Sequence, residues 1–130
     1  MAAFEMKDVR VLIVDDDPTA LKLMANFIGR IGCQADFAKN GREAVEKVRA
    51  TGFDICFMDI LMPEMNGVEA TQIIREELSR QMPIIAITSS MMKTTRETCF
   101  DVGMNDFVVK PVSLETISAM VNQYVLKQAA

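Results

Sequence analysis

Short apolar runs recur along the chain, and the segments between them carry apolar residues at every third or fourth position. The apolar runs cover residues 9–14, 34–38, 54–58, 83–87 and 106–109. At least three of them are nearly continuous in Val, Ile, Phe or Met, which is typical of strands that are covered on both faces. The pattern therefore predicts five short strands.

The segments between the runs carry the signals of helix ends. The first predicted helix begins at Asp17 and Pro18, an N-cap acid followed by a proline in the first turn, and it ends at Gly32. The same reasoning predicts a second helix from near Asn40, a third over about 66–78, a fourth over about 91–102 and a fifth from Ser113.

Five strands that alternate with five helices predict an α/β fold with a parallel sheet covered by helices on both faces. Right-handed crossovers leave few strand orders, and we expect the flavodoxin-like (βα)5 doubly wound order 2-1-3-4-5. The 130 residues suit a single domain. We expect residues 1–8 to form an N-terminal extension and residues 9–128 to form the domain.

Polar residues follow four of the apolar runs. In open parallel sheets, ligands bind at the carboxyl ends of the strands, so we expect these residues to converge on one edge. They are the triplet 15–17, which is all aspartate, then Asp59, the triplet Thr88, Ser89 and Ser90, and the pair Lys110 and Pro111.

The expected cluster of Asp15, Asp16 and Asp59 needs compensating positive charge. Two carboxylates about 4 Å apart repel each other by roughly 4 kcal/mol at an effective dielectric near 20. Lys110 supplies one positive charge, and a site of carboxylates, a backbone carbonyl and waters suits Mg²⁺. A carboxylate nucleophile, a metal, a lysine and the Thr88 hydroxyl together predict phosphoryl-transfer chemistry.

Composition excludes several other classes of function. The chain has no histidine, which removes Ser-His-Asp and Cys-His nucleophile systems and the commonest zinc ligand. The net charge of −4 argues against direct nucleic-acid binding. No apolar run is long enough for a membrane helix, residues 1–8 do not form a signal peptide, and three scattered cysteines suggest free thiols in the cytoplasm.

Four stretches resemble the receiver domain family of two-component response regulators, and the resemblance covers roughly residues 9–125. They occur in the order and at the separations that the family shows, so together they are specific. The matching stretches are Val11-Leu-Ile-Val-Asp-Asp-Asp-Pro18, Met58-Asp-Ile-Leu-Met-Pro-Glu-Met-Asn-Gly67, Ile87-Thr-Ser-Ser90 and Gly103-Met-Asn-Asp-Phe-Val-Val-Lys-Pro111.

The resemblance implies a role for each matching residue. Asp59 is the phosphorylated residue and a metal ligand, beside the acidic pair Asp15 and Asp16, of which Asp16 binds the metal directly. Leu61 supplies a backbone carbonyl to the metal. Further roles are a switch hydroxyl on Thr88, a phosphate-pairing ammonium on Lys110, a switch aromatic ring at Phe107, a cis bond between Lys110 and Pro111, and a rim formed by Leu61, Ser89 and Ser90.

The resemblance also implies partners. The phosphoryl donor is a phosphohistidine on a histidine kinase or a histidine phosphotransfer domain, and the finer similarity is to receivers of hybrid kinases and phosphorelays. Such a receiver is a phosphoacceptor switch rather than a turnover enzyme. The expected output is a change in binding of an unidentified downstream protein at the face made by the fourth helix, fifth strand and fifth helix, unless the chain is a module of a larger protein.

Several other interpretations stay open. Asp15, Asp17 and Thr19 fit the Asp-x-Asp-x-Thr motif of haloacid-dehalogenase-type phosphatases, although Asp59 would then have no task. A degenerate receiver that acts as a constitutive binding module is a second alternative. Asp17 is interpreted as an N-cap and Phe107 as either a switch or plain core. The chain departs from the family pattern at Asn66, where an aspartate is usual, and at Leu61, where a polar side chain is common.

Overall fold

The computed structural model describes residues 5–89 and 92–126. Its five strands form one parallel sheet in the order β2-β1-β3-β4-β5, so the predicted flavodoxin-like topology is confirmed. Ser90 and the outer residues of the expected extension and domain lie outside the described ranges. The strands are β1 Arg10–Val14, β2 Gln34–Ala38, β3 Ile55–Asp59, β4 Ile84–Thr88 and β5 Asp106–Val109.

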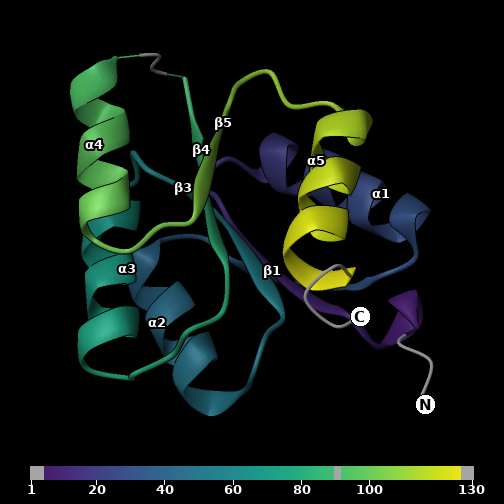
Figure 1. Cartoon of the computed structure of the whole chain (residues 1–130), viewed down its shortest axis with the longest axis horizontal. Helices are drawn as coiled ribbons and strands as arrows, with labels where there is room; N and C mark the ends of the chain where they lie inside the picture. Colours follow the sequence, from purple (N-terminus) through teal and green to yellow (C-terminus); the bar gives the residue numbers. More distant parts are fainter. Residues whose placement is uncertain (1–4, 90–91, 127–130) are drawn as a thin grey trace.

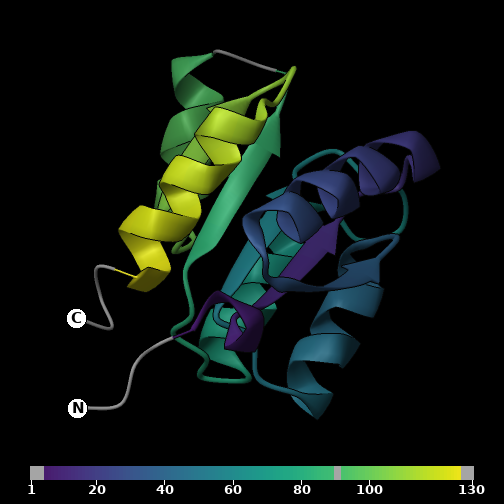
Figure 2. The same cartoon turned by 90° about the vertical axis from the view of Figure 1, so that its right-hand side faces the viewer.

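Five α-helices cover the two faces of this sheet, with α2, α3 and α4 on one face and α1 and α5 on the other (Figure 1). Figure 2 shows the same layers from the side. The helices are α1 Pro18–Ile31, α2 Gly41–Ala50, α3 Gly67–Glu76, α4 Lys93–Asp101 and α5 Leu114–Val121, and the last of these continues into a π-helical turn, η2 Asn122–Leu126.

The start and end of α1 follow from local chemistry. The Asp17 carboxylate accepts a hydrogen bond from the Thr19 backbone N–H at 3.0 Å, and Pro18 occupies the first turn, where its missing N–H costs nothing. Gly32 ends the helix with a φ of 101°, a left-handed conformation that glycine adopts without strain. Asp17 is therefore an N-cap, as predicted.

Two helices are shorter than the sequence pattern predicts. The helix α3 ends at Glu76 rather than near residue 78, because the chain turns at Ser79 with a positive φ of 54°. The helix α4 begins at Lys93 and ends at Asp101, where predicted bounds were 91–102. The differences are confined to terminal turns, where fraying makes bounds least specified by sequence.

The sheet separates two apolar cores. One lies under α2, α3 and α4, and the other lies under α1 and α5. All five residues of both β3 and β4 are buried, which explains their continuous apolar runs. Burial of each large aliphatic side chain contributes about 1.5–3 kcal/mol to folding. The two ends of each of these strands are thereby held at fixed positions.

Arg75 joins the end of α3 to the loop before β4 and to the loop before β5. Its Nε donates to the Gly103 carbonyl at 3.0 Å, Nη1 to the Arg80 carbonyl at 2.8 Å and Nη2 to Asn105 Oδ1 at 2.9 Å. The same Asn105 oxygen accepts from the Ile84 N–H at 2.9 Å. One half-buried guanidinium therefore satisfies three acceptors and anchors the edge of the sheet opposite the polar strand ends.

All three cysteines are buried and free. Burial raises the pKa of the Cys33 and Cys99 thiols and that of the Cys56 thiol to about 12. Cys33 lies 3.9 Å from the Met6 sulfur, in the short 3-10 turn η1 Met6–Asp8. Cys99 is the buried residue of α4. In the part of the chain described, no helix is both long and apolar enough to cross a membrane.

Candidate functional site

Among the described residues, the polar side chains predicted to converge do follow strands at the carboxyl edge of the sheet. Asp15 follows β1, Asp59 ends β3, Thr88 ends β4 and Lys110 follows β5. Because β1, β3, β4 and β5 are consecutive neighbours in the sheet, residues up to 95 positions apart in the chain come into contact. The topology therefore assembles one polar site from four strand ends.

Three carboxylates form the acidic part of the site. Asp15, Asp16 and Asp59 each offer an oxygen, and these oxygens lie within 4.8 Å of one another. Asp15 and Asp59 are only 4% and 6% exposed, while Asp16 is exposed. Two buried carboxylates and one open to solvent fit an oxygen-ligated divalent cation that keeps several waters.

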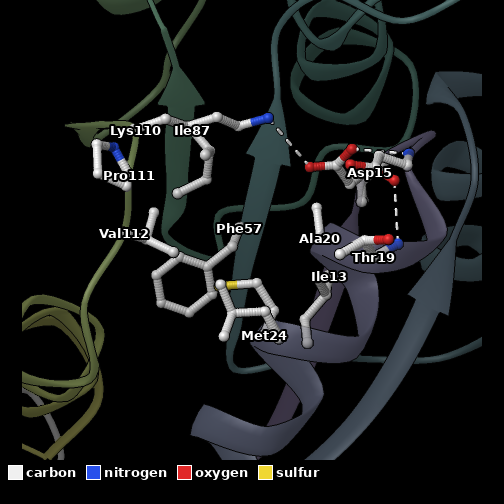
Figure 3. Close-up of a pocket in the computed structure, with 13 residues that line it drawn as sticks. Ile13, Asp15, Thr19, Ala20, Met24, Phe57, Ile87, Lys110, Pro111 and Val112 are labelled. Atoms are coloured by element: carbon white, nitrogen blue, oxygen red, sulfur yellow. Dashed lines mark hydrogen bonds and ion pairs between the residues drawn. The ribbon is translucent and has the colours of Figure 1, made fainter.

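Lys110 supplies positive charge between the two buried carboxylates. Its Nζ lies 3.4 Å from an Asp15 oxygen and 3.6 Å from an Asp59 oxygen, and Figure 3 shows the ammonium reaching toward Asp15. The other Asp15 oxygen accepts from the Asp17 N–H at 2.9 Å. Asp15 is thus held on two sides, while Asp59 keeps an ion pair with Lys110.

The surroundings of Asp59 favour its neutral form. Burial and the Asp15 charge raise the pKa of Asp59 to about 6, although Lys110 acts in the opposite direction. For Lys110 itself, burial opposes the ammonium, but the charges of Asp59 and Asp15 outweigh it and raise the pKa above the ordinary value. The one lysine therefore does not balance the acids, so a bound cation would be favoured electrostatically.

The loop after β3 is fixed tightly against the Asp59 backbone. A Cβ on Gly67 would lie 2.3 Å from the Asp59 carbonyl oxygen, so only glycine fits there. The Gly67 N–H donates to the Ile60 carbonyl at 2.9 Å. Asn66, the departure from the family pattern, forms a capping box with Glu69 at the start of α3. Asn66 therefore has a structural task at this turn.

Thr88 and Lys110 are placed side by side by backbone pairing. The Lys110 N–H donates to the Thr88 carbonyl at 2.7 Å, and Thr88 is 4% exposed. Ser89, predicted on the rim, is exposed, and Ser90 lies outside the described residues. The peptide bond between Lys110 and Pro111 is cis. The structure thus places Thr88 next to Lys110, whose ammonium contacts the acids.

Leu61 and Phe107 flank this site in different environments. Leu61 lies two residues after Asp59 and is 74% exposed, which is unusual for leucine. Phe107 on β5 is half-buried and packs against the core under α2, α3 and α4. The Arg96 guanidinium carbon lies 4.4 Å from the centre of the Phe107 ring. The sequence pattern carried no signal for this contact with Arg96.

An apolar cavity of about 430 Å³ opens beside Lys110 and Asp15 (Figure 3). Its sides come from α1 and from the segment after β5, and its floor comes from the sheet. The sequence pattern did not predict this cavity, because its lining residues are spread over four elements. Its apolar lining includes Ile13, Ala20, Leu23, Met24, Phe57, Ile87, Pro111 and Val112.

Comparisons with known proteins agree with the geometry. Residues 11–122 match the family model described as the response regulator receiver domain. The chain is 42% identical over 120 residues to "Transcription factor SKN7" of Chaetomium thermophilum, an alignment that covers 91% of this chain and 16% of that protein. The chain therefore spans only a small part of this longer relative.

Solved structures give the same result. The receiver domain of Ssk1 from Saccharomyces cerevisiae, solved together with the histidine phosphotransfer protein Ypd1, has a TM-score of 0.88 and 28% identity, over 98% of this chain and 95% of that one. A Pseudomonas aeruginosa sensor-kinase receiver domain, with magnesium in its active-site cleft, has a TM-score of 0.82 and 28% identity over 89% and 96% of the two chains. With its topology, its acidic strand-end cluster and these matches, the chain belongs to the response regulator receiver domain family.

Proposed function

We propose that Asp59 accepts a phosphoryl group from a phosphohistidine, on a histidine kinase or a histidine phosphotransfer domain, in a Mg²⁺-dependent reaction. The observation that carries this proposal is the Asp59 carboxylate itself, which ends β3 among Asp15, Asp16 and Lys110. A buried carboxylate beside a lysine and two further acids can act as a nucleophile toward phosphorus. The proposed product is an aspartyl phosphate.

In the proposed step, an Asp59 oxygen forms a bond to phosphorus while the bond from phosphorus to the histidine nitrogen breaks, and the imidazole leaves. Lys110 lies 3.6 Å from Asp59, close enough to pair with a phosphoryl oxygen. The Thr88 hydroxyl would donate a hydrogen bond to a second phosphoryl oxygen. Asp15, Asp16, Asp59 and the Leu61 carbonyl would hold Mg²⁺, which neutralises charge on the transferring group when bound.

The surface around the site supports a protein donor. The apolar cavity adjoins Lys110 and Asp15, and Leu23 on α1 lines it while remaining 45% exposed. Leu61 adds a second exposed apolar side chain near Asp59. Exposed apolar residues around a polar centre are typical of protein interfaces. These features favour a phosphotransfer protein over a small metabolite as the physiological donor.

We further propose that phosphorylation shifts the chain between two conformations, in the manner of a switch rather than a turnover enzyme. Contact of the phosphoryl group with Thr88 would bias the Phe107 ring and the face made by α4, β5 and α5, where a downstream protein would bind. A cytoplasmic location is consistent with the three free, buried cysteines. No direct binding of nucleic acid or membrane is part of this proposal.

The proposal is tested by transfer of radiolabelled phosphate from a phosphorylated histidine phosphotransfer domain to the purified chain. We expect label on Asp59, located by mass spectrometry of borohydride-reduced peptides, and loss of transfer when Mg²⁺ is chelated. Transfer that proceeds unchanged without a divalent cation, or label on another residue, would contradict it.

Mg²⁺ affinity should depend on Asp16. The cluster offers few carboxylates and the cation keeps waters, so binding should be modest, and removal of the exposed ligand should weaken it at least tenfold, which corresponds to about 1.4 kcal/mol. Titration of Asp16→Ala and of the wild type, followed by amide NMR because the chain has no tryptophan, measures this. Asp8→Ala is a matched control outside the cluster. Equal affinities would place the cation elsewhere.

The aspartyl phosphate should be long-lived because of Leu61. The side chain is 74% exposed near Asp59, so it is not packed against a neighbour and can obstruct the approach of water. Leucine also offers no hydrogen bond to orient that water. We expect Leu61→Asn to lose phosphate faster, by up to roughly tenfold. Leu61→Met keeps an apolar side chain and should retain the slow rate; equal rates in all three proteins would remove Leu61 from this role.

A further inference from the structure

Arg96 and Phe107 form a contact between α4 and β5 on the face expected to bind a downstream protein. The guanidinium carbon lies 4.4 Å from the ring centre, well within the roughly 6 Å range of a cation–π interaction. Arg96 is exposed, while the Phe107 ring is half-buried and also packs against the core under α2, α3 and α4. The ring thus contacts both a packed core and an exposed cation.

Two other described features of α4 are of a different kind. Cys99 is the buried residue of this helix, and the ion pair between Lys93 and Glu97 lies within the helix, with side chains 88% and 58% exposed. Such a pair contributes little to tertiary packing. The stacking of Arg96 on Phe107 therefore provides a directional link from α4 to the strand that leads to Lys110.

The contact between Arg96 and Phe107 occurs together with a particular set of ion pairs at the proposed phosphorylation site. In the same structure, Lys110 pairs with the carboxylates of Asp59 and Asp15, at 3.6 Å and 3.4 Å. In the proposed function this is the pairing that precedes phosphoryl transfer, because Lys110 afterwards pairs with a phosphoryl oxygen. The contact between Arg96 and Phe107 therefore occurs together with the Lys110 pairing that precedes transfer.

We propose that Arg96 is a positioning residue that holds the Phe107 ring in its pre-transfer place and so opposes the phosphorylated conformation. This inference rests on the proposed function, since it needs Asp59 as the acceptor and Phe107 as part of the switch. A ligand or residue that stabilises one of two conformations shifts their ratio by the strength of its differential contact. An exposed cation–π contact shifts it by about two- to fivefold.

The test compares Arg96→Gln, which removes the cation, with Arg96→Lys, which keeps it, and with Lys93→Gln as a matched loss of charge on the same helix. The readout is the affinity for beryllofluoride, a phosphoryl analogue that binds an aspartate carboxylate, at a fixed Mg²⁺ concentration. We expect Arg96→Gln to bind it about two- to fivefold more tightly. Arg96→Lys should recover part of the wild-type affinity, and Lys93→Gln should equal the wild type.

Fluorination of the ring separates the cation–π contact from simple packing. Fluorine atoms withdraw electrons from the ring face and weaken its attraction for a cation, with little change in shape. We expect replacement of Phe107 by phenylalanines with one, two and three fluorine atoms to increase the affinity for beryllofluoride stepwise when Arg96 is present. The same replacements should have no effect in Arg96→Gln. The fluorine resonances report directly whether the ring has moved.

The outcomes distinguish this inference from the proposed function. If Asp59 is not labelled by a phosphohistidine donor, the proposed function fails. If Asp59 is labelled and binds beryllofluoride, but Arg96→Gln binds it as the wild type does or more weakly, only the role of Arg96 is overturned. A stepwise fluorine effect that persists without Arg96 would also overturn it. Arg96 is exposed, so these variants should fold, and urea unfolding confirms that.

Discussion

Asp59→Asn should lose phosphorylation by acetyl phosphate and Mg²⁺ almost completely, with a labelling rate reduced at least about 100-fold. An amide is not a nucleophile toward phosphorus, and no neighbouring acid can take its place: Asp15 is held by Lys110 and the Asp17 N–H, and Asp16 faces solvent. Intact-mass spectrometry measures the fraction phosphorylated with time.

Two further variants make this experiment decisive. Asp101→Asn, at the end of α4, removes an exposed aspartate away from the site and should label like the wild type. Asp15→Asn should slow the reaction yet leave the label on Asp59. Labelling that survives in Asp59→Asn and disappears in Asp15→Asn would instead support phosphatase chemistry on the aspartate triplet.

Asp59→Asn should also stabilise the fold in metal-free solution above pH 6. The pKa of Asp59 is raised from 3.8 to about 6, so folding favours the neutral acid and the charged form costs stability. The cost is absent below the unfolded pKa, develops as the pH rises from about 3.8 to about 6, and is constant above the folded value. At pH 7, Asp59→Asn should therefore raise the free energy of unfolding by about 1–3 kcal/mol.

Urea unfolding of both proteins between pH 4 and pH 8, with a chelator present, measures the difference. We expect the two stabilities to converge near pH 4, to separate as the pH rises to about 6, and to differ by a constant amount from there to pH 8. Addition of Mg²⁺ should then stabilise the wild type more than the variant, because the cation offsets the repulsion at Asp59. A difference that is constant with pH would show that the Asp59 charge is not the cause.

Much of the fold could be predicted because its signals are local. The strands β3 and β4 are fully buried, and a fully buried parallel strand needs a continuous apolar run that is visible in one dimension. Asp17, Pro18 and Gly32 mark the ends of α1 by their own backbone chemistry. The strand order followed from connection rules, and the convergence of Asp15, Asp59, Thr88 and Lys110 followed from that order.

What sequence reasoning missed depends on contacts between distant segments. Arg75 looks like any helix-surface arginine until the fold places Gly103 and Asn105 beside it. The cavity beside Lys110 exists only because α1 and the segment after β5 stand apart over the sheet. Arg96 meets Phe107 through the placement of α4 on β5, which no periodicity in the sequence encodes.

The rates at which the buried cysteines react can measure local opening of this fold. A thiol reacts as its thiolate and only when exposed, so a colourless reagent can modify Cys99 only when α4 lifts from the sheet. Cys56 lies within β3 and is paired with both neighbouring strands, so its exposure requires the sheet itself to come apart. The ratio of the two modification rates would therefore report, without any substitution in the chain, how often α4 opens independently of the remaining fold.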